Sequence, residues 1–173
     1  KDKTNPPTLS DDDIDRLEHA KKFMKEETGY QAIQRSKPQT LGYGLSDSPV
    51  GLAAWITEKF NTWCDGSVET TFTKDQLLTN IMIYWVTNTI TSSTRLYYES
   101  MRSDRFGPPE SYVEAPTACA VFPHELTRLP RAWAEESFNI RQWTEMPRGG
   151  HFAAMEEPEL LVNDIRTFFA SIP

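Results

Sequence analysis

The chain has 173 residues, a length that suits one ordinary domain or parts of two. Its 25 acidic residues outnumber its 18 basic ones, which gives a formal charge of −7 without any cluster of Lys and Arg. Nucleic-acid binding is therefore not expected, because neutralising phosphates requires a basic surface. The longest apolar run, IMIYWV at 81–86, is much too short to span a bilayer.

The first part of the chain begins with an extended lead-in over 1–9. Ser10, followed by three aspartates, predicts the start of a helix with acidic residues in its first turn. Gly29 ends this helix immediately before Tyr30. The stretch 31–47 contains Pro and Gly and is typical of a loop.

Three further helices are predicted before residue 102. Ser48-Pro49 provides the start of the first of them. Thr73 and Gln76 form a capping-box pair for the next, which carries apolar residues at positions i, i+4 and i+8. The polar segment 88–101 predicts more helix beyond a bend. The first hundred residues are therefore expected to be mostly helical.

The composition changes after this helical part. Residues 102–111 contain two prolines and a glycine and predict a linker. Beyond it, alternating strands and helices are expected, with strands at 112–122 and 140–146 and helices beginning at Pro130 and Pro158. Because a stable sheet usually has more than two strands, we expect this α/β unit to be the end of a larger sheet. The other strands would then lie outside this sequence.

The two cysteines, Cys64 and Cys119, are far apart and lack the spacing of a metal site. We predict reduced thiols in a cytosolic-type setting, and a single disulfide between them is the alternative.

A histidine in a glycine-rich turn is the strongest candidate for chemistry. His151 follows Gly149 and Gly150, which allow a sharp turn that exposes the imidazole. Glu125 lies 26 positions earlier, just after the first predicted strand. Two strand-to-loop junctions separated by one helix can bring such residues together, so we predict a base and its orienting acid. The alternatives are a turn histidine bonded to backbone and a carboxylate at a helix start.

Several short motifs occur together in a characteristic order. They are TGY at 28–30, SKPQT at 36–40, DSPVGLAA at 47–54, SSTRLY at 92–97, FPHE at 122–125 and RGGHF at 148–152. Together they closely resemble the C-terminal part of microsomal-type epoxide hydrolases, which belong to the α/β-hydrolase superfamily. The resemblance implies an α/β fold in which residues 1–105 form the last part of a helical lid. Residues 106–173 would then form the C-terminal part of the hydrolase core.

The resemblance also implies an activity and a set of site residues. The family converts lipophilic epoxides and water to vicinal diols through a covalent ester on an aspartate. By resemblance, His151 activates the water and Glu125 orients His151. Tyr30 and Tyr97 are the lid tyrosines that donate hydrogen bonds to the epoxide oxygen, and Tyr98 competes with Tyr97 for the second role.

Two parts of the family's pattern are missing from the sequence. Neither the nucleophilic aspartate on a strand-to-helix turn nor the His-Gly-Trp-Pro loop occurs, and no Gly-x-Ser-x-Gly elbow replaces them. We therefore expect an N-terminal half that carries the nucleophile, and in which a membrane anchor could also lie.

The expected ligand is an apolar epoxide, with no cofactor and no metal. A cytoplasmic location is favoured, and a homodimer is compatible with the sequence. Two other functions stay open: another α/β-hydrolase reaction, such as ester hydrolysis or dehalogenation, and a non-catalytic lid fragment that binds apolar ligands.

Overall fold

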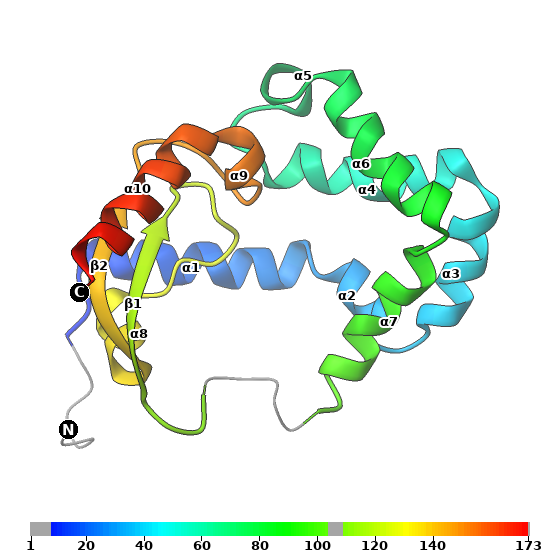
Figure 1. Cartoon of the computed structure of the whole chain (residues 1–173). Helices are drawn as coiled ribbons and strands as arrows, with labels where there is room; N and C mark the ends of the chain where they lie inside the picture. Colours follow the sequence, from blue (N-terminus) through cyan, green and yellow to red (C-terminus); the bar gives the residue numbers. More distant parts are fainter. Residues whose placement is uncertain (1–7, 104–108, 173) are drawn as a thin grey trace. The chain divides into compact units, whose positions relative to one another are not determined.

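The computed structural model describes residues 8–103 and 109–172 (Figure 1). Contacts divide these residues into two compact units, one of 8–25 with 109–172 and the other of 26–103. The boundary expected between residues 105 and 106, the middle of the expected linker and most of the expected lead-in lie outside the described residues. The two domains inferred from the sequence therefore stay a prediction.

The first unit is built on two parallel strands. Strand β1 (Val113–Val121) pairs with β2 (Phe138–Glu145), and α8 (Arg131–Ser137) leads into β2. The short helix α9 (Ala153–Glu156) follows the sheet and precedes α10 (Pro158–Ser171), which lies beside the strands in Figure 1. Both strands and the helices expected from Pro130 and Pro158 are confirmed.

Helix α1 (Asp11–Glu26) packs in the same unit through an arginine. The guanidinium of Arg16 is buried and donates to Asp12 Oδ2 at 2.7 Å and to Glu145 Oε2 at 3.0 Å. At the helix start, the backbone N–H and hydroxyl of Ser10 donate to the Asp13 carboxylate at 3.0 and 2.7 Å. The helix expected after Ser10 is therefore confirmed, and a charged residue anchors it.

The second unit is helical within the described residues. Its elements are α2 (Gly29–Gln34), α3 (Pro38–Asp47), α4 (Pro49–Trp63), α5 (Val68–Thr71), α6 (Lys74–Thr87) and α7 (Ile90–Ser100). The helices expected from Ser48, Thr73 and the segment 88–101 are confirmed. The core of this unit is formed by Leu45, Leu52, Ile81 and Ile90, which come from four different helices.

The loop expected over 31–47 is wrong, because most of α2 and all of α3 occupy this stretch. Pro38 lies in the first turn of α3, where its missing N–H costs no hydrogen bond. Gly42 is buried where α3 crosses α7, and a Cβ there would lie 2.4 Å from Thr91 Oγ1. This glycine therefore allows two helices to approach closely; it does not interrupt one.

Local capping explains the start and the end of α6. The Gln76 N–H donates to Thr73 Oγ1 at 3.2 Å, and the Thr73 N–H donates to Gln76 Oε1 at 2.8 Å. This reciprocal pair is the predicted capping box. At the other end, Asn88 adopts a left-handed conformation with φ 52°, which turns the chain from α6 into α7.

Cys64 and Cys119 are not joined in a disulfide, so that alternative is wrong. The described residues contain no helix with the length and apolarity needed to cross a bilayer.

Candidate functional site

The two strands bring Glu125 and His151 to the same edge of the sheet. A parallel bridge between His124 and Gly150 extends the β1–β2 pairing beyond the end of each strand. Within it, the His124 N–H donates to the Gly149 carbonyl at 3.1 Å. The residue after each bridge partner is one of the two candidates, so the strand register itself juxtaposes Glu125 and His151. The carboxyl ends of parallel strands are where α/β proteins usually place their ligands.

The side chains of these two residues are hydrogen-bonded. His151 Nδ1 lies 2.7 Å from Glu125 Oε1, and the two side chains are 36% and 35% exposed. The Leu126 N–H donates to the same oxygen at 2.6 Å. Burial alone would raise the pKa of Glu125, but the bonds from His151 and from the Leu126 N–H outweigh it and lower that pKa.

The lowered pKa has a consequence for the tautomer of the histidine. Glu125 is an ionised acceptor at neutral pH, so His151 carries a proton on Nδ1, the nitrogen that faces the carboxylate. A neutral imidazole with its proton there presents Nε2 as a proton acceptor. The pair can therefore take a proton from water and stabilise the resulting imidazolium.

Gly149 shapes the turn that precedes His151. Its φ of +106° lies in the left-handed region, which favours glycine. A Cβ at this position would also lie 2.7 Å from Cδ1 of the Phe122 ring. The turn expected from the two glycines thus depends on Gly149 for its conformation, whereas Gly150 takes part in the strand bridge.

The second unit holds the two predicted tyrosines side by side. Tyr30 in α2 and Tyr97 in α7 have ring centroids 5.8 Å apart, with their planes at 77°. The ring centroid of Trp63 lies 5.3 Å from that of Tyr30. Burial, followed by the influence of Tyr30 and a hydrogen bond with it, raises the pKa of Tyr97 to about 12. Tyr97 is therefore protonated at neutral pH and can act as a hydrogen-bond donor.

Tyr98, the competing residue, has different surroundings. The guanidinium of Arg102 lies over its ring, 3.6 Å from the centroid. The structure thus brings Tyr97 beside Tyr30 and stacks Tyr98 with an arginine.

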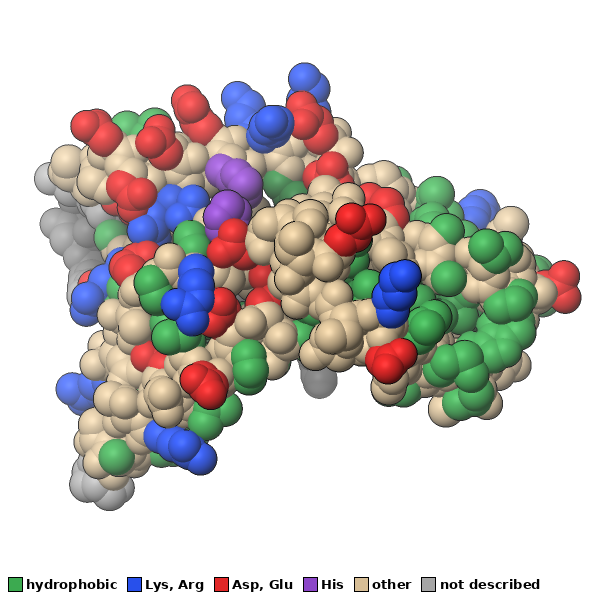
Figure 2. All heavy atoms as spheres, turned by 90° about the horizontal axis from the view of Figure 1, so that it is seen from above, with side chains coloured by type: hydrophobic (Ala, Val, Ile, Leu, Met, Phe, Trp, Pro, Cys, Tyr) green, Lys and Arg blue, Asp and Glu red, His purple; other side chains and the backbone are tan. Residues whose placement is uncertain are grey.

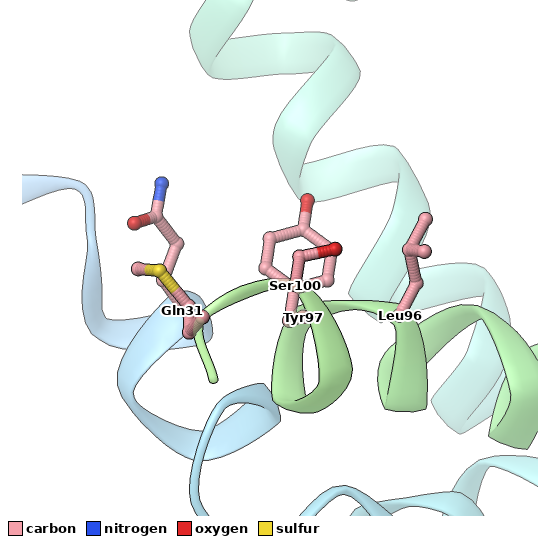
Figure 3. Close-up of a pocket in the computed structure, with 5 residues that line it drawn as sticks. Gln31, Leu96, Tyr97 and Ser100 are labelled. Carbon is pink, nitrogen blue, oxygen red and sulfur yellow. The ribbon is translucent and has the colours of Figure 1, made fainter. Parts of the chain in front are cut away.

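A pocket of about 250 Å³ opens beside Tyr97 (Figure 3). It is lined by Gln31, Leu96, Tyr97, Ser100 and Met101. Figure 3 shows the side chains of Gln31, Leu96 and Tyr97 pointing to the same side. Aliphatic side chains with a few polar groups suit a small apolar molecule that carries one polar atom. The described residues hold no group of His, Cys, Asp and Glu arranged for a metal ion.

The sequence interpretation missed two kinds of residue around these pairs. Gln31, whose amide donates to the Tyr30 hydroxyl at 3.0 Å, lies in the stretch expected to be a loop. Glu156 carries no predicted role in the site, but its carboxylate accepts from the Gly150 and Phe152 N–H groups on either side of His151. An acidic residue shortly after a glycine-rich turn is a signal for such a contact, because the amides of the turn need acceptors.

No protein-family model matches the chain. The chain is 46% identical over 156 residues to epoxide hydrolase 1 of Sus scrofa, covering 84% of this chain and 34% of that protein. It is 49% identical over 153 residues to juvenile hormone epoxide hydrolase 2 of Ctenocephalides felis, covering 82% and 33% respectively.

Solved structures agree with these relatives. The crystal structure of juvenile hormone epoxide hydrolase from the silkworm Bombyx mori matches with a TM-score of 0.86 and 36% identity. The match covers 94% of this chain and 42% of that one. The chain therefore spans well under half of that structure, and about a third of the length of the curated relatives it matches.

Proposed function

Because the chain resembles epoxide hydrolases of the α/β-hydrolase fold over most of its length, we propose that it forms part of an enzyme that hydrolyses apolar epoxides to vicinal diols. The observation that carries the proposal is the 2.7 Å contact between His151 Nδ1 and Glu125 Oε1. It lies where two parallel strands end, and it directs Nδ1 toward the carboxylate, which makes Nε2 the nitrogen that would accept a proton from water.

The tyrosines supply the other half of the chemistry. Opening an epoxide develops negative charge on the ring oxygen, and donors aimed at that oxygen stabilise the transition state. Tyr30 and Tyr97 lie together, and the pKa of Tyr97, about 12, keeps its O–H in place as a donor. We assign both residues to binding the epoxide oxygen, with the pocket beside Tyr97 receiving an apolar substituent.

The nucleophile is proposed to come from polypeptide outside these 173 residues. An aspartate there attacks one ring carbon, the C–O bond breaks, and the alkoxide takes up the hydroxyl proton of Tyr30 or Tyr97. His151 then takes a proton from water, and the resulting hydroxide attacks the ester carbonyl, which releases the diol and regenerates the aspartate. The proton on the imidazolium returns through solvent to the tyrosinate, so both residues recover their starting forms. The enzyme that unites this chain with the nucleophile-bearing part is called the complete enzyme below.

The test is to separate the two chemical steps in the complete enzyme. With a styrene-type epoxide, His151→Gln should still form the ester but should not hydrolyse it, so intact mass should show a stable adduct. His19→Gln, an exposed histidine on α1, serves as the matched control and should turn over normally. Steady diol production by His151→Gln would remove His151 from the mechanism. Absence of diol from the unaltered enzyme with aryl, alkyl and anionic epoxides alike would overturn the proposed function.

A further inference from the structure

We propose that Glu156 is a positioning residue that holds the backbone of the His151 turn in the shape required for water activation. The proposal rests on the proposed function in one respect, since it assigns Glu156 to the ester-hydrolysis step. It concerns a contact that is separate from the Glu125 bond, because Glu125 holds the imidazole and Glu156 holds the main chain.

The carboxylate of Glu156 bonds the turn on both sides of His151. The Gly150 N–H donates to Glu156 Oε2 at 3.0 Å, and the Phe152 N–H donates to Glu156 Oε1 at 2.8 Å. Each carboxylate oxygen thus accepts from a neighbour of the histidine. Bonds from backbone N–H groups to an ionised acceptor are stronger than bonds between neutral groups.

The position of Glu156 follows from the short helix that comes after the turn. Glu156 is the last residue of α9, and its own N–H donates to the Phe152 carbonyl at 2.9 Å. Because α9 makes a single helical turn, the carboxylate of Glu156 lies next to the segment that precedes the helix. The left-handed Gly149 and the His124–Gly150 bridge support the first half of the turn. Glu156 also restrains the second half.

The adjacent acid has a different partner. Glu157 Oε1 accepts from Arg148 Nε at 2.6 Å, in an ion pair whose arginine side chain is 61% exposed. The two neighbouring glutamates are therefore not interchangeable, and the contact to the amides on both sides of His151 belongs to Glu156.

The experiment uses Glu156→Gln and Glu156→Ala in the complete enzyme, with Glu159→Gln as control. Gln keeps one acceptor and loses the other, while Ala loses both. A small displacement of a reacting group can slow a step about a hundredfold, so ester hydrolysis should slow roughly tenfold in the Gln variant and more in the Ala variant. The rate of ester formation should stay at the unaltered value in the Gln variant. Glu159 is exposed in the first turn of α10, and its variant should match the unaltered enzyme.

A second readout needs no substrate. Hydrogen exchange of the Gly150 and Phe152 amides should be about tenfold faster in Glu156→Gln and unchanged in Glu159→Gln. Faster exchange in an enzyme that turns over no epoxide would support the contact while overturning the proposed function. Unchanged exchange together with unaltered ester hydrolysis would overturn the role of Glu156. Equal slowing of both chemical steps with a lower Tm would also overturn it, because that pattern indicates a purely structural residue.

Discussion

The hydrogen bond between His151 and Glu125 joins the proposed base to a carboxyl group whose pKa is lowered. Two donors, His151 and the Leu126 N–H, lower the pKa of Glu125 in spite of its partial burial. The carboxylate therefore orients the ring and balances its charge without taking up the proton itself. This division of roles determines what each substitution should do.

Glu125→Gln should slow hydrolysis of the ester but leave its formation intact. The amide can still contact Nδ1, but it cannot balance the imidazolium charge, so the step should slow by roughly a hundredfold or more. The loss should be smaller than that of His151→Gln. Single-turnover decay of the ester measures the effect, and Glu135→Gln, in an exposed pair with Arg131, is the control. A Glu125→Gln enzyme with unaltered ester decay would contradict the assigned role.

The same lowered pKa predicts a dependence of stability on pH. A carboxyl group whose folded-state pKa lies below its unfolded value stabilises the fold above that unfolded value, ordinarily about 4.5. The contribution is lost as the pH falls through the lower, folded-state pKa. In the complete enzyme, the Tm of the unaltered protein should therefore fall more steeply in acid than that of Glu125→Gln. Parallel Tm curves below pH 4.5 would show that the pair adds no such linkage.

Tyr97→Phe should slow opening of the epoxide ring. Loss of one donor to a developing oxyanion commonly costs about 3 kcal/mol of barrier, or roughly a hundredfold in rate. Tyr30→Phe should behave similarly, and the double variant should be nearly inactive. The rate of ester formation is the measurement. Tyr98→Phe is the matched control, because its ring stacks with Arg102. If Tyr98→Phe were nearly inactive and Tyr97→Phe fully active, the second donor to the epoxide oxygen would be Tyr98.

Elements with capping signals were predictable from the sequence. The Thr73–Gln76 box, the Ser48-Pro49 start and the acidic first turn after Ser10 all begin helices in the structure. The segment 31–47 was not predictable in this way. Its prolines and glycines have the composition of a loop, and the need for Gly42 is visible only when α3 meets α7. Long-range packing, which local signals do not contain, decides the structure there.

The capping box also predicts a loss of stability. Thr73→Ala removes the acceptor of the Gln76 N–H, which should cost about 1 kcal/mol of unfolding free energy. Thr79→Ala, an exposed position in the same helix, is the control and should change stability little. Denaturant titration of the two variants in the complete enzyme provides the comparison. Equal midpoints would show that the box does not stabilise α6.

For the whole molecule, the sequence predicted the alternation of the two strands with the helices from Pro130 and Pro158, and the pairing of Glu125 with His151. The pairing was predictable because both residues follow the ends of predicted neighbouring strands. The Tyr30–Tyr97 contact was not derivable from local pattern, because it depends on the packing of α2 and α7; only the family resemblance selected these residues. The contact of Glu156 with the turn was not predicted, because it depends on the short helix α9, which the sequence analysis did not expect.

The chain should not form a stable, well-packed unit by itself. The described part of the sheet has two strands, fewer than an independent sheet usually needs. Figure 2 shows hydrophobic side chains gathered over the region of α6, and the exposed apolar residues of that helix are Leu78, Met82, Ile83 and Val86. Calorimetry of the 173-residue chain should therefore show no sharp cooperative transition. A sharp transition with a large enthalpy would contradict this expectation.

Gly42 of α3 and Thr91 of α7 can change only together in evolution. A methyl group added at position 42 would lie 2.4 Å from Thr91 Oγ1 and 3.0 Å from Thr91 Cβ, so a smaller hydroxyl-free side chain relieves only part of the clash. In a library randomised at both positions, Gly42→Ala should be recovered with Thr91→Gly and be depleted with unaltered Thr91. Among related sequences, positions 42 and 91 should accordingly covary: a glycine at one position should accompany a larger residue at the other.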